Sequence, residues 1–596
     1  MPLENKTVFL VHSPTRNLDD YKAIAEHACK LKPYGDVQMN ISTLAVKSFH
    51  EMPAGGSPWH QYASNNPCPQ NFFPHDKLKP FIPAEFVEKN RELLLVKAKI
   101  LRELGLGAAF WSYEPNFLPE AFYEAYPHMR GPRVDHPRRS RQEAFSPCLA
   151  VADTQEMIAG QVAELIKNVP EIKTYFFKTN DAGPGICWSH WQYSGPNGPA
   201  HCRNRTMGQR VRDLLDAINR GVEMGGGDLR ISFTGLFANW EADDIERHLP
   251  DNAFFRKPRA GRGATTAITG SVDMCYPCRG MVNPMRVLNS LEKLADGKPR
   301  TVFVSFRPSY DRGYEQVDAA GKVFDIAADY LGEPVSGIIP ILQRLEKLSQ
   351  QWAGPEEKDT LFNAMVELQE IFKSQASCGI RPGTWAVSLR HTTRPLVAVP
   401  GNLTEQEESY WLPHVFNVSV EEARQDYLDV HGGRASGVNV RALRGVVGRF
   451  VRLAETLEGL ESAPEKELFH RMAKSLRIYA SFIRSGLNFY QMQMLRDRNA
   501  ERFAQVSPTP AKEASWTGDT DIIPMNEQMR DELDNTQELI ALLEDGGMDL
   551  VCHSEDASEE DIFLLGPDLI DQLKYKCKIM RRHWLDIQDY LAPPHK

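Results

Sequence analysis

The fold is predicted most directly by the stretch Lys173-Thr-Tyr-Phe-Phe-Lys178, which is followed by Thr-Asn-Asp-Ala-Gly-Pro-Gly185. Its aromatic centre and its short length are typical of a buried β-strand. The apolar run stops abruptly at Asn180-Asp181, and glycine and proline then turn the chain into a long loop. This pattern predicts a strand that ends in a carboxylate.

Similar strand-like segments alternate with helix-like segments through the first 400 residues. Strands are predicted over 7–12, 36–41, 107–113, 173–178 and 228–233, and less clearly over 252–256, 301–306 and 384–389. Helices are predicted over 18–31, 83–104, 154–169 and 208–222. Such alternation indicates parallel strands joined by crossover helices. The long loops that follow the strands favour a (β/α)₈ barrel of the TIM type over a doubly wound sheet.

The pattern changes after about residue 415. Apolar residues then recur every three or four positions, as in Leu476, Tyr479, Ile483 and Leu487, which is typical of amphipathic helices. We therefore predict an α/β barrel domain over 1–414 and an all-helical C-terminal domain over 415–596.

Composition and motifs exclude several classes of function. The chain has 596 residues and a formal net charge of −10, which provides no general attraction to nucleic acid. It has no apolar run long enough for a membrane span and no visible signal peptide, so we expect a cytoplasmic protein, or a periplasmic or secreted one if a signal was removed. Cys275 and Cys278 lack a second ligand pair, and the first strand is not followed by a G-x-G-x-x-G motif. We therefore expect neither a metal nor a cofactor.

Three carboxylates are candidates for catalysis. Asp181 ends the strand quoted above, Glu114 directly follows the strand over 107–113, and Glu241 follows the strand over 228–233. Hydrolysis of a glycosidic bond needs one acid to protonate the leaving oxygen and a second carboxylate as base or nucleophile. We assign the acid to Asp181, although a turn-forming aspartate is the alternative, and rank Glu241 and Glu114 nearly equal for the second role.

Aromatic and basic residues in the same loops are candidates for substrate binding. Aromatic faces stack on sugar rings, and arginine binds carboxylates through two parallel hydrogen bonds. The arginines could equally be solvated surface charges, and the aromatic loop after residue 55 could simply pack on itself. The candidates are Trp59, His60, Arg130, His136, Arg138, Arg139, Asn180, Trp188, Trp191 and His201.

The segment Lys178-Thr-Asn-Asp-Ala-Gly-Pro-Gly185, with Gly195-Pro-Asn-Gly-Pro199 after it, resembles the end of the fourth strand in certain barrel glycoside hydrolases. These are the family-67 α-glucuronidases and the family-20 hexosaminidases. The resemblance implies that Asp181 is the general acid. The chain departs from both families, since the hexosaminidases have an Asp-Glu pair at this place and the glucuronidases a glutamate.

These observations together predict a glycoside hydrolase that acts on an oligosaccharide or polysaccharide, with a uronic acid or another anionic group in the substrate. The alternatives are a carbohydrate-binding protein on a catalytically inactive barrel, or a sugar isomerase or lyase. We expect no nucleic-acid or membrane partner, and we leave open a homodimer through the helical domain.

Overall fold

The structure is a computed structural model of the chain. It describes residues 7–46, 48–49, 66–134, 143–180, 185–190, 202–256, 265–269, 277–298, 300–305, 317–377, 391–409, 437–505, 522–560 and 564–587. The chain forms two compact units, one made of Met1–Gly270 and Val287–Ser336 and the other of Ser271–Arg286 and Gly337–Lys596. The predicted domain boundary at 414/415 lies outside the described residues and stays a prediction.

The first unit contains one sheet of eight parallel strands. They are β1 (Val8–His12), β2 (Asp36–Asn40), β3 (Gly107–Tyr113), β6 (Ile172–Lys178), β7 (Arg230–Thr234), β8 (Ala253–Phe255), β9 (Thr265–Thr269) and β10 (Thr301–Ser305). Their order in the sheet is β8-β7-β6-β3-β2-β1-β10-β9, so the first strand pairs with both the second and the last. This is the cyclic order of an α/β barrel, interrupted between β8 and β9, which do not pair within the described residues.

The predicted strands are confirmed at seven positions, to within two residues at each end. β9 was not predicted from the sequence, and the strand predicted over 384–389 lies outside the described residues. A small antiparallel pair, β4 (Arg130–Arg133) and β5 (Phe145–Pro147), lies in the long segment after β3, between the helices α4 (Glu120–Ala125) and α5 (Ala152–Asn168).

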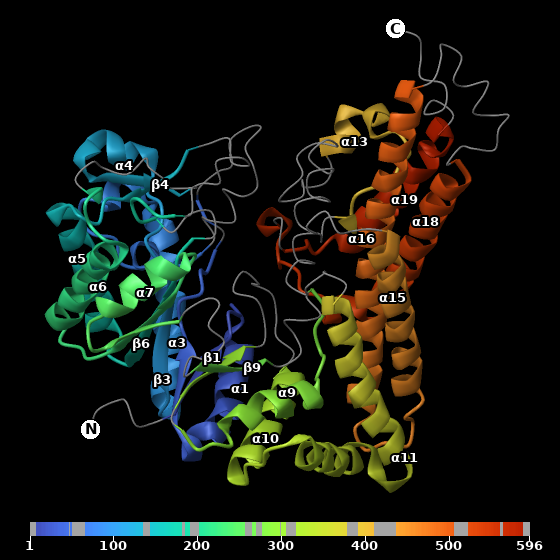
Figure 1. Cartoon of the computed structure of the whole chain (residues 1–596), viewed down its shortest axis with the longest axis horizontal. Helices are drawn as coiled ribbons and strands as arrows, with labels where there is room; N and C mark the ends of the chain where they lie inside the picture. The colour runs from blue at the N-terminus through green and yellow to red at the C-terminus, as the bar shows by residue number, and fades with distance from the viewer. Residues whose placement is uncertain are drawn as a thin grey trace. The chain divides into compact units, whose positions relative to one another are not determined.

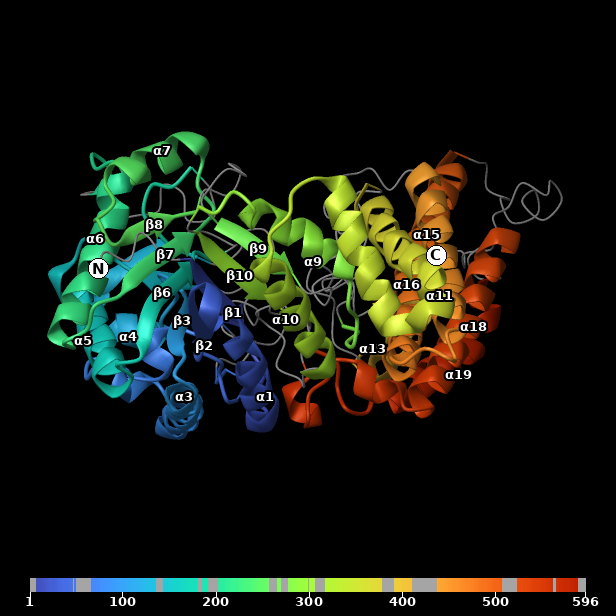
Figure 2. The same ribbon diagram turned by 90° about the horizontal axis from the view of Figure 1, so that it is seen from below.

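Helices cover the outer face of the sheet, and the other face, which we call the inner face, is turned away from them (Figure 2). Local sequence sets their ends: Asn17 accepts hydrogen bonds from two amides at the start of α1, and Gly105, at φ 62°, ends α3. Neighbouring helices pack in chain order, α1 on α3 and α10, and α5 on α6. Their bounds are α1 (Leu18–Ala28), α3 (Ala84–Leu104), α4 (Glu120–Ala125), α5 (Ala152–Asn168), α6 (Met207–Met224), α7 (Asn239–Arg247), α9 (Pro284–Leu291) and α10 (Val317–Gly332).

Side chains alternate between the two faces of each strand. On the inner face a cluster forms from Val8 and Leu10 of β1, Ala109 of β3, Phe176 of β6 and Phe303 of β10, with Trp111 packed against it. On the opposite face, which is turned toward the helices, side chains that are paired across adjacent strands stack on one another, as Phe110 of β3 does on Tyr175 of β6. The inner face is therefore closely packed. We call the aromatic side chains Trp111, Phe176 and Phe303, together with the groups that contact them toward the carboxyl ends of the strands, the aromatic floor.

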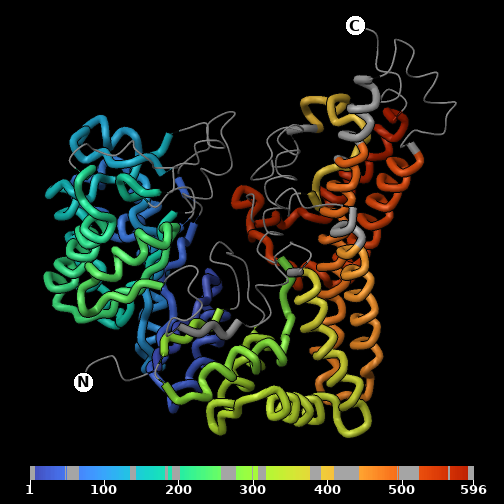
Figure 3. Tube along the Cα trace, viewed as in Figure 1, coloured from blue at the N-terminus to red at the C-terminus, as the bar shows by residue number. Residues whose placement is uncertain are grey.

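The second unit is built from long helices that run beside one another (Figures 1 and 3). Helix α15 packs on α11 and α16, α18 packs on α16, and α19 packs on α18. Gly354, at φ 81°, breaks the long α11 just before Pro355, because neither the left-handed backbone nor the missing amide continues a helix. The bounds are α11 (Ile338–Ser377), α13 (Glu405–Ser409), α15 (Gly437–Glu458), α16 (Lys466–Gln505), α18 (Ile522–Glu544) and α19 (Leu569–Arg582).

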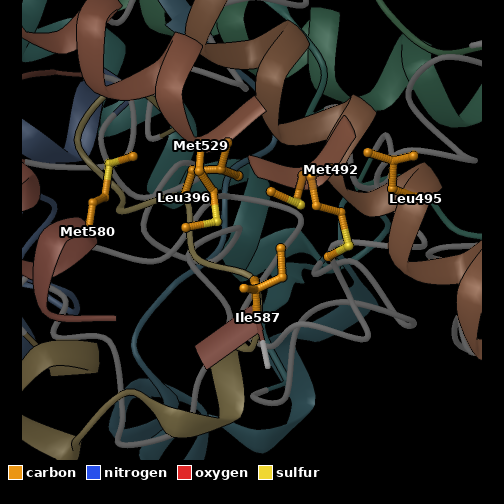
Figure 4. Close-up of a cluster of buried hydrophobic side chains, with 8 residues drawn as sticks. Leu396, Met492, Leu495, Met529, Met580 and Ile587 are labelled. Atoms are coloured by element: carbon orange, nitrogen blue, oxygen red, sulfur yellow. The ribbon is translucent and has the colours of Figure 1, made fainter. Parts of the chain in front are cut away.

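The amphipathic stripes meet in a core rich in methionine (Figure 4). Met492 of α16, Met529 of α18 and Met580 of α19 are fully buried together with Leu396 from the segment before α13. Flexible thioether side chains fill the irregular space between helices of different direction. Within the described part of the chain, the helices are all too short or too polar for a membrane span.

A histidine between two carboxylates links α13 to the chain after α19. His583 Nδ1 lies 2.6 Å from Asp586 Oδ2, and His583 Nε2 lies 3.0 Å from Glu407 Oε2. Burial lowers the pKa of His583, but the hydrogen bonds to Asp586 and Glu407 outweigh it and raise the pKa overall. The Thr404 amide, together with His583, lowers the pKa of Glu407 to about 2.

We expect this contact to stabilise the second unit most between about pH 4.5 and 6.5. The raised pKa of His583 adds to the free energy of unfolding at all pH values below the unfolded pKa of histidine, and this addition is lost as pH rises through the folded pKa. The lowered pKa of Glu407 adds to the free energy of unfolding above the unfolded pKa of glutamate, and this addition is lost as pH falls toward 2. His583→Gln should therefore cost about 1–3 kcal/mol at pH 5.5 and less at pH 8.5. Thermal unfolding at both pH values measures the difference, with His470→Gln as control, a half-buried histidine whose Nε2 lies 3.5 Å from the exposed carboxylate of Glu461. An equal loss at both values would rule out the titration.

Candidate active site

Aromatic rings from four strands meet near the carboxyl end of the inner face. The Trp111 ring lies 4.4 Å from that of His12 and 4.6 Å from that of Phe176, and Phe303 meets it edge-on at 5.5 Å. The indole nitrogen of Trp111 is buried and has no hydrogen-bond partner among the described residues. A buried donor of this kind is usually satisfied by water or by a ligand oxygen. Trp111 therefore marks the place where a polar ligand would contact the floor.

Two cations lie on the same aromatic floor. Lys178 ends β6, and its Nζ is 3.5 Å from the Tyr113 hydroxyl and 5.4 Å from the Tyr113 ring centroid. The guanidinium of Arg256, directly after β8, lies 4.9 Å from the ring centroid of Phe303. Aromatic faces and cations at the carboxyl end of parallel strands suit a ring-shaped ligand that carries a negative charge.

The end of β6 is held firmly against the neighbouring loop. Thr179 Oγ1 accepts a hydrogen bond from the Leu236 amide, and a Cβ at Gly235 would lie 2.4 Å from that oxygen. Asn180, 1 % exposed, is therefore fixed at the rim of the sheet. Asp181 itself lies outside the described residues. Its catalytic role remains a prediction.

Glu114 is buried on the helix-facing side of the rim. Its Oε1 accepts hydrogen bonds from Ser112 Oγ at 2.7 Å and from Tyr175 Oη at 2.9 Å. Tyr175 stacks on Phe110, away from the inner aromatic floor. Burial raises the pKa of Glu114 to about 7, although both hydroxyl hydrogen bonds oppose the shift. Glu114 is thus an acid poised near neutrality, separated by the sheet from Trp111.

Glu241 connects two loops through backbone hydrogen bonds. It is 0 % exposed, with Oε1 accepting from the His190 amide at 2.7 Å and Oε2 accepting from the Ala238 amide at 2.8 Å. Burial raises its pKa, and the two amides partly offset that rise. Both oxygens are occupied, so the carboxylate holds the start of α7 against the loop after β6.

We expect opposite results from amide replacements of the two glutamates. Glu241→Gln places an NH₂ group against a backbone N–H and should cost about 1–3 kcal/mol. Glu114→Gln should leave stability at pH 7 nearly unchanged, because its Oε1 still accepts from both hydroxyls. Thermal unfolding of the two variants makes the comparison, and equal losses would contradict these assignments. Retained turnover in Glu114→Gln would also remove Glu114 from the reaction.

The remaining predicted residues have different surroundings. Arg130 forms a two-pronged ion pair with Glu120, and its guanidinium lies 5.0 Å from the Tyr123 ring centroid and 4.7 Å from that of Phe145. Trp188 has a left-handed backbone, φ 62°, and lies under Arg203. The predicted residues that lie outside the described part of the chain are Trp59, His60, His136, Arg138, Arg139, Trp191 and His201.

Four residues at this end of the inner face were not predicted from the sequence as site residues: His12, Trp111, Lys178 and Arg256. Each ends or nearly ends a strand and shares the register of the inner face, so alternation along the strands could have identified them. Among the described residues there is also no group of three or more histidine, cysteine or acidic side chains arranged to hold a metal ion.

Neither the protein-family models nor the curated proteins include a match to this chain. Among solved structures, the chain is similar to a family-138 glycoside hydrolase that targets pectin rhamnogalacturonan II, with 10 % identity, TM-score 0.51, and coverage of 100 % of this chain and 69 % of that one. It also matches a family-89 glycoside hydrolase from Clostridium perfringens, with 12 % identity, TM-score 0.43, and coverage of 86 % and 54 %. A pneumococcal family-20 exo-β-D-N-acetylglucosaminidase module matches with 12 % identity, TM-score 0.32, and coverage of 58 % and 92 %.

At these identities the likeness shows the fold alone. The predicted resemblance to barrel glycoside hydrolases is confirmed at the level of the fold, and the described part of this chain combines a parallel α/β sheet with long helices. A specific resemblance to the family-67 α-glucuronidases stays a prediction.

Proposed function

We propose that this chain is a glycoside hydrolase that cleaves a glycan containing an anionic sugar, and that its sheet closes into a complete (β/α)₈ barrel. The observation that carries the proposal is the aromatic and cationic floor formed by Trp111, Phe303, Lys178 and Arg256. It lies at the strand ends where barrel enzymes bind substrates. The fold shared with a family-138 glycoside hydrolase supports the same class of reaction.

Asp181 is the proposed general acid. It directly follows Asn180 in the sequence, whose side chain is buried at the carboxyl end of β6. In this role its carboxyl group protonates the glycosidic oxygen as the bond to the anomeric carbon breaks. The second carboxylate would activate water or attack that carbon. Glu114 and Glu241 were the candidates, and their surroundings favour positioning roles: one supports β3 and β6, the other supports the rim loop.

Arg256 and Lys178 are the proposed contacts to the anionic group. We expect Arg256→Met to raise KM for a uronic-acid substrate about 10–100-fold, because one charge-assisted hydrogen bond contributes about 1.5–3 kcal/mol. KM for a matched neutral glycoside should change little. Arg212→Met, on the outer surface of α6 and paired with Asp216, is the control. An equal increase for both substrates would argue against charge recognition.

The proposed reaction is tested by assaying the full chain on glycosides that differ only in the presence of a carboxylate. Turnover of the acidic members that is lost in Asp181→Asn supports the hydrolase. A second candidate is a carbohydrate-binding protein on an inactive barrel, which is favoured by the engagement of both described acids, Glu114 and Glu241, with other protein groups. Ligand-dependent thermal stabilisation without turnover would favour it. Absence of both turnover and stabilisation would overturn the two together.

A further inference from the structure

A tryptophan is exposed at the carboxyl end of the sheet. Trp240 is the second residue of α7, which follows β7, and its side chain is 59 % exposed. Among the described residues of the first unit, one other large apolar side chain is comparably exposed: Met224, which ends α6 at the amino end of the sheet. An indole ring in water loses the free energy that burial of its apolar surface provides. A large aromatic side chain left uncovered at this edge of the sheet is therefore a candidate contact for a ligand.

A histidine ring stands beside the indole ring. The ring centroids of His190 and Trp240 lie 6.0 Å apart, and the two ring planes meet at 80°. His190 is also exposed, and it belongs to the segment after β6, the strand that pairs with β7. The two rings therefore form a corner with one flat apolar wall and a second wall whose nitrogen atoms can form hydrogen bonds.

The backbone on both sides of this corner is held by one buried carboxylate. Glu241 Oε1 accepts a hydrogen bond from the His190 amide at 2.7 Å, and Glu241 Oε2 accepts one from the Ala238 amide at 2.8 Å. Arg210 of α6 also donates to the Cys187 carbonyl and so holds the same segment after β6. The two segments that carry the rings are thus tied together before a ligand binds, which lowers the conformational entropy lost on binding.

The surroundings of Trp240 favour a sugar over a protein partner. The residues near it on the surface of α7 are polar and exposed, as Asn239, Asp243 and Glu246 show. A protein-docking surface usually offers a contiguous apolar area built from several side chains. A single aromatic face among hydrogen-bonding groups instead matches one pyranose ring, whose C–H groups stack on the indole while its hydroxyls contact the polar neighbours.

We propose that Trp240 and His190 form a second sugar-binding site, which we call the rim platform, and that it binds a further sugar unit of the glycan whose anionic unit contacts the aromatic floor. This inference rests on the proposed function. Because a chain extends at most about 3.6 Å per residue, Trp240 lies within about 22 Å of Thr234 at the end of β7. An oligosaccharide of a few units spans such a distance. The rim platform thus makes the chain prefer oligosaccharides to single sugars.

The test measures by isothermal titration calorimetry how the full chain binds galacturonic acid and its α-1,4-linked tetramer. We expect the unaltered chain to bind the tetramer at least about 10-fold more tightly than the monomer. Trp240→Ala should weaken tetramer binding about 10-fold and leave monomer binding unchanged, because only the tetramer reaches the indole. Trp240→Phe, which keeps an aromatic face, should retain most of the tetramer affinity. Met224→Ala, which shortens an equally exposed side chain at the opposite end of the sheet, is the control and should change neither affinity.

The outcomes separate the rim platform from the proposed function. Equal affinities for monomer and tetramer in the unaltered chain, or an unchanged tetramer affinity in Trp240→Ala, would overturn the rim platform and leave the proposed function standing. Monomer binding that is lost in Trp240→Ala would also overturn it, since Trp240 would then belong to the site of the first sugar. If the unaltered chain binds neither compound, the proposed recognition of an anionic sugar fails, and the rim platform fails with it.

Discussion

Asp181→Asn is expected to lower kcat on glycosides with poor leaving groups by about 10²–10⁴-fold, because the departing oxygen then leaves without a proton. Asparagine keeps the size and most hydrogen bonds of aspartate, so the fold should be unaffected. The loss should be smaller on aryl glycosides with acidic leaving groups, which need little protonation. This dependence on the leaving group identifies an acid rather than a residue that merely binds substrate.

The control for this variant is Asp228→Asn, an exposed aspartate before β7. It should retain the kcat of the unaltered chain on every substrate. The pH profile adds a second criterion: the alkaline limb should flatten in Asp181→Asn, since the titrating acid has been removed. An Asp181→Asn enzyme with unchanged kcat, or with equal losses on good and poor leaving groups, would exclude Asp181 as the general acid.

The sequence predicted the strands well where burial dominates the composition. The run over 173–178 and the strand over 107–113 are apolar and aromatic, and both form as expected. β9 was missed because Thr265-Thr-Ala-Ile-Thr269 is short and mostly polar, so neither its hydrophobicity nor its length distinguishes it from a loop. The formation of such a strand is decided by its neighbour β10 rather than by its own residues.

The site was predicted less completely, because contacts between residues far apart in the sequence decide which polar side chains are already hydrogen-bonded to other protein groups. Glu241 looked catalytic from its place after a strand, yet its two oxygens cap α7 and hold His190, and no serine or threonine at position 238 signals that cap. Glu114 follows β3, but the alternation of side chains turns it toward the helices.

Lys576→Met is expected to cause the largest loss of stability in the helical unit, about 3–5 kcal/mol. Lys576 of α19 and Glu532 of α18 form an ion pair with both side chains 0 % exposed. Lys576 Nζ also donates to the Thr392 carbonyl at 2.8 Å. Removing the cation leaves a buried carboxylate whose charge is no longer balanced, and water cannot replace the lost partner.

The hydrogen bonds around Glu532 make a matched rescue possible. Ser485 Oγ donates to Glu532 Oε1 at 2.7 Å, and Asn488 Nδ2 donates to Oε2 at 2.9 Å. Lys576→Met combined with Glu532→Gln removes both charges but keeps an acceptor for the serine, and so should recover part of the lost stability. Lys574→Met, two positions along the same helix and paired with exposed Glu544, should change nothing measurable.

Amide hydrogen exchange over α16, α18 and α19 measures these effects within the helical unit alone. We expect faster exchange in all three helices for Lys576→Met, an intermediate rate for the double variant, and the unaltered rate for Lys574→Met. Equal exchange in the two single variants would mean that the buried pair contributes no more than a surface one. A double variant less stable than Lys576→Met would show that the hydrogen bonds to Glu532, rather than its charge, decide the stability of this core.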